Sequence, residues 1–107
     1  MRILVLKTCD TCRRAVKDLR AAGHAPEVVD IRADGLSEAD RAAVVAAFGD
    51  KAVNRASATW RGLSEAEREA PAEALLAAHP TLMRRPVIMA GERITQGWSA
   101  EVRESWL

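Results

Sequence analysis

Cys9 and Cys12 are the only two cysteines of this 107-residue chain, and two residues separate them. A thiol pair at this spacing can carry redox chemistry, because one sulfur can attack a substrate and the other can displace the product. The thiolate is the reactive form of cysteine, so the surroundings of the pair decide whether it reacts.

The expected elements place Cys9 where an anion is stabilised. Residues 3–6 form an unbroken apolar run, which is typical of a strand covered on both faces. From Cys12 onward apolar residues follow helical spacing until Gly23, which predicts a helix that ends there. Cys9 then lies at the helix N-terminus, where unpaired N–H groups and the positive end of the helix dipole favour a thiolate.

Charged neighbours act on the same sulfur. Lys7, Arg13 and Arg14 add positive charge near Cys9, which also favours the thiolate. Asp10 adds a negative charge and opposes them. The sequence predicts a pKa for the Cys9 thiol below the ordinary value of about 8.5.

Two other readings of the cysteine pair stay open. The pair could supply half of a zinc site, but a closed site needs four ligands, and the remaining candidates, His24 and His79, are isolated in the sequence. It could instead form a structural disulfide, although so short a loop constrains the unfolded chain little. A Cys-x-x-Cys pair beside a βαβ pattern favours a thioredoxin-like redox motif.

The overall composition limits the classes of function. The length predicts one domain over residues 1–107, large enough for a core without disulfides. Sixteen basic and fifteen acidic residues give a net charge of +1, so we expect no direct nucleic-acid binding and no membrane binding. No stretch is long and apolar enough for a membrane span, and we expect a cytoplasmic protein. No phosphate-binding loop or metal cluster is present, so no bound cofactor or metal is expected.

The order of the remaining elements predicts the fold. After the first strand and helix come a second strand, two helical stretches, a pair of short strands and a last helix. Helix starts are indicated by Ser37, by the capping box Ser64–Glu67 and by Ser99. The expected ranges are 27–31 for the second strand, 37–49 and 64–80 for the helical stretches, 87–89 and 93–95 for the last two strands, and a helix from 99 onward. This β-α-β, helical insertion, β-β-α order predicts an α/β, thioredoxin-like fold with a four-stranded mixed sheet.

Three arginines are candidate anion ligands. Arg84 and Arg85 precede Pro86 at the entrance to the third strand, where a proline can sit without breaking the ladder. The planar fork of an arginine can hold an oxyanion by two parallel hydrogen bonds. Arg55 falls in a segment without clear periodicity, and loop residues often carry function. The alternative for each is a solvated surface cation, and the sequence alone favours that alternative for Arg84 and Arg55.

Several motifs together resemble the glutaredoxin-linked arsenate reductase (ArsC) family, which includes the Spx regulators and the YffB-like proteins. The matching segments, in order, are the cysteine loop, Val53-Asn54-Arg55, Thr59-Trp60-Arg61, the run from His79 to Ile88 with its Leu-Met-Arg-Arg-Pro block, and Gly97-x-Ser99. The Asn-Arg and Thr-Trp-Arg stretches are most similar to the YffB-like branch. The resemblance spans nearly the whole chain.

This resemblance implies roles for individual residues. Cys9 corresponds to the nucleophile, Arg55 and Arg85 to the arginines that bind the substrate oxyanion, and Pro86 to a cis proline facing the cysteine loop. The amides from Cys9 to Thr11 would help to hold the anion. In the arsenate enzymes the cysteine attacks arsenate, glutathione displaces arsenite, and glutaredoxin clears the mixed disulfide. Glutathione is then a co-substrate rather than a cofactor.

The sequence departs from that pattern in two places. A third arginine expected after the last strand is replaced around Gln96-Gly97, which removes one positive charge. Cys12 is additional to the single essential cysteine, and it could resolve a mixed disulfide on Cys9, with a dithiol protein such as thioredoxin as reductant.

The resemblance leaves two functions to compare. The first is a monomeric thiol-dependent reductase of a small oxyanion, such as arsenate, or of a glutathione mixed disulfide. The alternative is an Spx-like redox-sensing regulator that binds RNA polymerase, because that group shares the fold and the Cys-x-x-Cys switch. We expect the enzyme.

Overall fold

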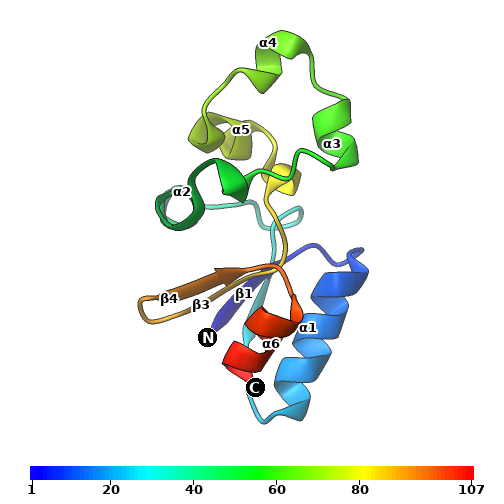
Figure 1. The fold of residues 1–107 in the computed structure, drawn as a ribbon, viewed down its shortest axis with the longest axis vertical. Coiled ribbons are helices and arrows are strands. Elements are labelled where there is room, and N and C mark those ends of the chain that lie inside the picture. The colour runs from blue at the N-terminus through cyan, green and yellow to red at the C-terminus, as the bar shows by residue number, and fades with distance from the viewer. The chain divides into compact units, whose positions relative to one another are not determined.

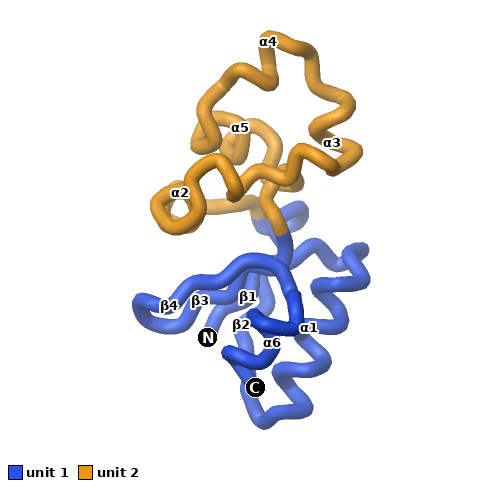
Figure 2. The backbone as a smooth tube through the Cα atoms, viewed as in Figure 1, with its two compact units in different colours: residues 1–34, 85–107 blue, residues 35–84 orange.

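The computed structural model describes residues 1–107, and the chain divides into two units (Figure 2). The first unit contains both ends of the sequence, residues 1–34 and 85–107, and the second is the continuous insertion of residues 35–84. That the two units together form the one domain expected from the length remains a prediction.

A four-stranded mixed sheet forms the first unit, in the strand order β2-β1-β3-β4. Its strands are β1 (Arg2–Val5), β2 (Glu27–Asp30), β3 (Val87–Ala90) and β4 (Arg93–Gln96). The β1 and β2 strands pair in parallel, whereas β3 runs antiparallel to both β1 and β4. The α/β, thioredoxin-like fold predicted from the sequence is confirmed.

Two helices, α1 (Asp10–Ala21) and α6 (Ala100–Trp106), cover one face of this sheet (Figure 1). Their buried side chains meet those of β1 and β3 in one core. Apolar packing of this kind contributes most of the favourable free energy of folding. The core consists of Ile3, Val5, Cys12, Ala15, Leu19, Ile88 and Trp106.

The central strand β1 is buried on both faces, as its unbroken apolar run predicts. Ile3 points to the α1 and α6 face, and its neighbour Leu4 points to the opposite face, yet neither is exposed to solvent. Helix α1 ends as expected before Gly23, whose φ of 93° lies in the left-handed region that glycine adopts without strain. Helix α6 begins at Ser99, whose hydroxyl accepts the Val102 backbone N–H at 3.2 Å.

The regular elements of the second unit are all helices, and one isolated β-bridge joins Val53 to Met83. Its capping signals are confirmed, because the Ser37 hydroxyl accepts the N–H of Asp40, and Ser64 and Glu67 form a reciprocal capping box. The elements of this unit are α2 (Glu38–Phe48), a 3₁₀ helix (Gly49–Ala52), α3 (Ala58–Arg61), α4 (Glu65–Arg68), α5 (Ala72–Ala78) and a 3₁₀ helix (Pro80–Leu82).

Across both units, no helix has the length and the apolar character needed to cross a membrane.

The α3 helix was not expected from the sequence. Ser57 caps it by accepting the N–H of Trp60 at 3.2 Å, but the helix is only four residues long. A segment this short cannot show an apolar repeat, so periodicity does not detect it.

Candidate active site

Cys9 occupies the N-cap position of α1, between β1 and the helix. Its backbone is extended, with φ of −88° and ψ of 117°. The Cys9 N–H donates to the Leu6 carbonyl at 2.9 Å, and the Cys9 carbonyl accepts the Arg13 N–H at 3.1 Å. These bonds hold the cysteine at the start of the helix, and its side chain remains partly exposed.

Cys12 lies one turn further along the same helix, inside the core. Only 1% of its surface is exposed, whereas Cys9 is partly accessible. Both residues are free thiols. The structure thus gives the two sulfurs different surroundings, as expected of a nucleophile and a protected partner.

The surroundings of Cys9 favour its thiolate. Burial alone would raise the pKa of the Cys9 thiol, but the backbone N–H and the thiol of Cys12 and the guanidinium of Arg85 together lower it. The Cys9 side chain does not form a capping hydrogen bond of ordinary geometry. The backbone N–H of Cys12 nevertheless lowers the pKa of Cys9, because it stabilises a negative charge on the sulfur. The lowered pKa predicted from the sequence agrees with this geometry.

The surroundings of Cys12 favour the neutral thiol. Burial, together with the hydrogen bond and the charge of the neighbouring Cys9 sulfur, raises the pKa of Cys12 to about 12. The Leu6 N–H and the Arg85 charge oppose this rise without overcoming it. Cys12 is therefore a hydrogen-bond donor to Cys9 in the resting protein, a role that sequence reasoning did not assign to it. The sequence signal for a buried Cys12 thiol was its position in the apolar stripe of α1.

Arg85 comes to the cysteine loop from the other end of the sequence. It immediately precedes β3, and the Arg85–Pro86 peptide bond is cis, the form that the family resemblance implies. The Pro86 carbonyl accepts the Gly97 N–H at 2.8 Å, which ties this turn to the end of β4. Next to it Gln96 pairs with Val87 across the strands, and its Oε1 atom is buried without a hydrogen-bond partner.

The cations close in sequence have other partners. Arg13 forms an ion pair with Asp10 at 2.8 Å, so these two charges largely cancel. The charge of Lys7 lowers the pKa of Asp30, whose main stabilisation comes from the Arg32 backbone N–H. The cation that acts on Cys9 is Arg85, a site residue that the family resemblance implied, and not the cations next to Cys9 in the sequence that the local pattern favoured.

The other predicted site residues are Thr11, in the first unit, and Arg55, in the second. Thr11 is in the first turn of α1 and is half-buried. Arg55 belongs to the second unit, where its guanidinium lies 5.5 Å from the centre of the Trp60 ring. There it lines a small cavity of about 200 Å³ together with Lys51 and Arg84. Within the first unit, the structure brings together Cys9, Cys12 and Arg85.

The two histidines have local partners. The Nε2 atom of His24 hydrogen-bonds the Trp106 carbonyl at 2.8 Å, and His79 lies 3.7 Å from the Glu67 carboxylate. No three residues of the types that bind metals gather anywhere in the chain.

The fold and this site define a thioredoxin-like protein with a partly exposed cysteine at a helix N-terminus. The family model for the ArsC family matches residues 4–105. The chain therefore belongs to the ArsC family.

Individual relatives agree with this assignment. An uncharacterized protein of Haemophilus influenzae is 33% identical over 99 residues, covering 88% of this chain and 87% of that protein. The solved structure of the YFFB (PA3664) protein is 27% identical, with a TM-score of 0.89 over 99% of this chain and 97% of the other. An arsenate reductase (ArsC) related protein from Brucella melitensis is 26% identical, with a TM-score of 0.75 over 98% and 92% of the two chains. The similarity to the YffB-like branch inferred from the motifs is confirmed.

Proposed function

We propose that this protein is a thiol-dependent reductase whose Cys9 thiolate attacks arsenate or the disulfide of a glutathione adduct. The observation that carries the proposal is a partly exposed Cys9 whose pKa is lowered by the backbone N–H and the thiol of Cys12 and by the guanidinium of Arg85. Membership of the ArsC family supports a reductase-type function. Activated cysteines of this kind act by forming a covalent intermediate.

With arsenate, the Cys9 sulfur bonds to arsenic and a hydroxide leaves, taking up a proton as water. The thiolate of glutathione then bonds to the Cys9 sulfur, and the electron pair of the sulfur–arsenic bond stays on arsenic. Arsenic is reduced from the +5 to the +3 state and leaves as arsenite, while two sulfurs are oxidised to a mixed disulfide. A further thiol reduces that disulfide and regenerates Cys9.

With a glutathione mixed disulfide as substrate, Cys9 attacks the glutathione sulfur and the other sulfur leaves as a thiolate. Both reactions thus converge on the same Cys9 adduct with glutathione. Thiol–disulfide exchange of this kind is fastest when the attacking group is already a thiolate near neutral pH.

Because Cys12 is buried, we assign the resolving step to glutathione, with or without glutaredoxin. At 1% exposure and with a pKa near 12, Cys12 is a poor nucleophile while Cys9 is negatively charged. Formation of a Cys9 adduct removes that charge, so Cys12 becomes easier to ionise and remains the second candidate. A dithiol protein such as thioredoxin would then serve as reductant.

The anionic substrate group requires donors beside the sulfur. We assign this part to Arg85 and the backbone amides from Cys9 to Thr11, with Arg55 as a further ligand on the basis of the family motif. Oxyanions bind well to helix N-termini because unpaired N–H groups point outward there. The neutral Gln96 provides one charge fewer than the arsenate enzymes are expected to have, which favours a substrate of lower charge than arsenate.

Turnover assays can test this proposal directly. The purified protein is given arsenate with glutathione and glutaredoxin, or a mixed disulfide of glutathione and 2-mercaptoethanol with glutathione but no glutaredoxin. NADPH consumption is coupled through glutathione reductase, and the rate without the protein is subtracted. We expect turnover of at least one substrate, its loss in Cys9→Ser, and unchanged turnover in the exposed-site control Arg32→Gln. Activity that survives Cys9→Ser would reject the proposal.

The same preparation can distinguish the regulator alternative. A pull-down of the oxidised protein with the α subunit of RNA polymerase is expected to give no complex if the protein is a reductase. A stable complex together with absence of turnover on both substrates would favour the Spx-like function instead.

A further inference from the structure

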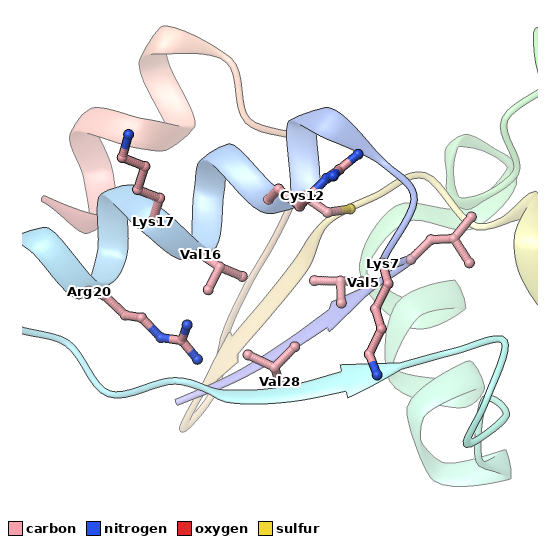
Figure 3. Close-up of a pocket in the computed structure, with 9 residues that line it drawn as sticks. Val5, Lys7, Cys12, Val16, Lys17, Arg20 and Val28 are labelled. Atoms are coloured by element: carbon pink, nitrogen blue, oxygen red, sulfur yellow. The ribbon is translucent and has the colours of Figure 1, made fainter.

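A groove beside the cysteine helix is not used by the proposed reaction (Figure 3). It has a volume of about 490 Å³ and runs between α1 and the strands β1 and β2. This volume falls within the range of small-molecule sites in proteins, about 300–1,000 Å³. Neither Cys9 nor Arg85 lines it.

The floor of the groove is aliphatic. Val5 from β1, Val16 from α1 and Val28 from β2 converge there in Figure 3. Val28 is 37% exposed, which is unusual for a large apolar side chain in this protein. Covering such a surface is favourable because it removes apolar area from water.

The charged side chains that line the groove are all cationic. Lys7, Arg13, Lys17 and Arg20 contribute to it, and no acidic side chain does. Arg20 forms no ion pair in the structure, whereas Arg13 is neutralised by Asp10.

The positions of the charges suggest how a ligand would lie. Figure 3 shows the guanidinium of Arg20 and the ammonium of Lys7 on opposite sides of Val28, while the ammonium of Lys17 points away from the valines. Lys7 also acts on the neighbouring Asp30, and Lys17 points away, so Arg20 is the cation beside the valines that has no opposing charge. An anionic group is therefore best placed at the Arg20 end, with an apolar body over the valines.

We propose that this groove binds a small aliphatic carboxylate, whose carboxylate pairs with Arg20 and whose hydrocarbon chain covers Val16 and Val28. The argument for this occupant is charge complementarity together with a volume that suits a small molecule. A ligand in this position contacts the Cys12 side of α1, away from the partly exposed Cys9 sulfur.

Octanoate is a suitable probe, because it combines a carboxylate with a flexible aliphatic chain. We would titrate the reduced, full-length protein with octanoate and follow backbone amide chemical shifts. We expect saturable shifts at Val16, Arg20 and Val28, and weaker binding as salt concentration rises. Octanol lacks the charge and acetate lacks the chain, so each is expected to bind several-fold more weakly.

Matched variants identify the groove as the site. Arg20→Gln removes the proposed carboxylate partner, and Val28→Asn makes the floor polar at an already exposed position. Each is expected to weaken octanoate binding several-fold, whereas Arg14→Gln, an exposed arginine of the same helix outside the groove, is expected to leave it unchanged. Absence of saturable binding, equal binding of octanol, or an equal effect of Arg14→Gln would overturn the proposal. Cys9→Ser is expected to bind octanoate normally, so this test stands apart from that of the reductase function.

Discussion

Arg85 hydrogen-bonds to the sulfur of Cys9 and places its positive charge beside it, although the two residues lie near opposite ends of the sequence. The contact depends on the turn before β3, where the Arg85–Pro86 bond is cis and the Pro86 carbonyl is tied to Gly97. Strand β3 pairs directly with β1, the strand that leads into the cysteine loop. The pairing of β1 with β3 therefore brings Arg85 to Cys9, whereas the cations next to Cys9 in the sequence have other partners.

Removal of this cation should make Cys9 less acidic. In Arg85→Gln the pKa of the Cys9 thiol is expected to rise, because a charge and a hydrogen bond that favour the thiolate are both lost. The measurement is the rate of iodoacetamide alkylation as a function of pH, which follows the accessible Cys9. The control Arg32→Gln should keep the wild-type midpoint. An unchanged midpoint in Arg85→Gln would show that Arg85 does not support the thiolate.

Replacement of Cys12 separates its two possible roles. Cys12→Ser keeps a hydrogen-bond donor next to Cys9, so the alkylation midpoint should stay low, whereas Cys12→Ala lacks a donor and should raise it. If glutathione resolves the adduct, Cys12→Ser also keeps glutathione-dependent turnover. Loss of turnover in Cys12→Ser, with a normal Cys9 midpoint, would instead assign the resolving step to Cys12.

The buried Cys12 thiol should destabilise the protein at alkaline pH. Its pKa is about 12 in the folded state and about 8.5 in the unfolded chain, so only the unfolded chain loses the proton between these values. The stabilisation is complete below pH 8.5 and is lost as pH rises toward 12, by at most about 1.4 kcal/mol per pH unit. Urea unfolding with reductant at pH 7.5 and 9.5 measures this loss. Cys12→Ser should lose less stability over that interval, and an equal loss would contradict the assignment.

Asp18 should contribute stability that disappears in acid. Its carboxylate accepts hydrogen bonds from Trp98 Nε1 at 3.0 Å and from Arg103 Nε at 3.1 Å, and these bonds lower its pKa. Because the folded pKa is the lower one, the contribution is present above the unfolded value of about 3.9 and is lost as pH falls through the folded value. Asp18→Asn should therefore reduce the free energy of unfolding at pH 7, and the difference from wild type should shrink at pH 3. The exposed Asp34→Asn serves as control, and a difference independent of pH would contradict the role of the charge.

A cation at position 96 should shift substrate preference toward oxyanions. The Gln96 Oε1 atom has no hydrogen-bond partner, so substitution breaks no bond made by that atom. Gln96→Arg is expected to raise kcat/KM for arsenate relative to the glutathione mixed disulfide, on the order of tenfold if the new contact contributes about 1.4 kcal/mol in the transition state. Gln96→Met, of similar size and uncharged, should leave the ratio unchanged. If this ratio of kcat/KM values does not rise in Gln96→Arg, position 96 does not determine the choice between the two substrates.

Local structure followed closely from the sequence. The apolar run at residues 3–6, the stripe that begins at Cys12 and the capping box at Ser64 each predicted the element found there, because backbone period and capping chemistry are set by neighbouring residues. The position of Cys9 at a helix N-terminus followed from the same local rules. Only very short elements such as α3 were missed.

The amino-acid sequence by itself determined the elements, the fold class and the placement of one cysteine at a helix start. Tertiary structure alone decided which cation serves that cysteine, since Arg13 pairs with Asp10 and Arg85 reaches Cys9 across the sheet. The physical reason is range: capping and periodicity act over a few residues, whereas charge acts through space between residues that only the folded chain brings together. The difference between Cys9 and Cys12 arises in the same way, because burial in the core formed by β1, β3, α1 and α6 keeps one thiol neutral and leaves the other ready to react.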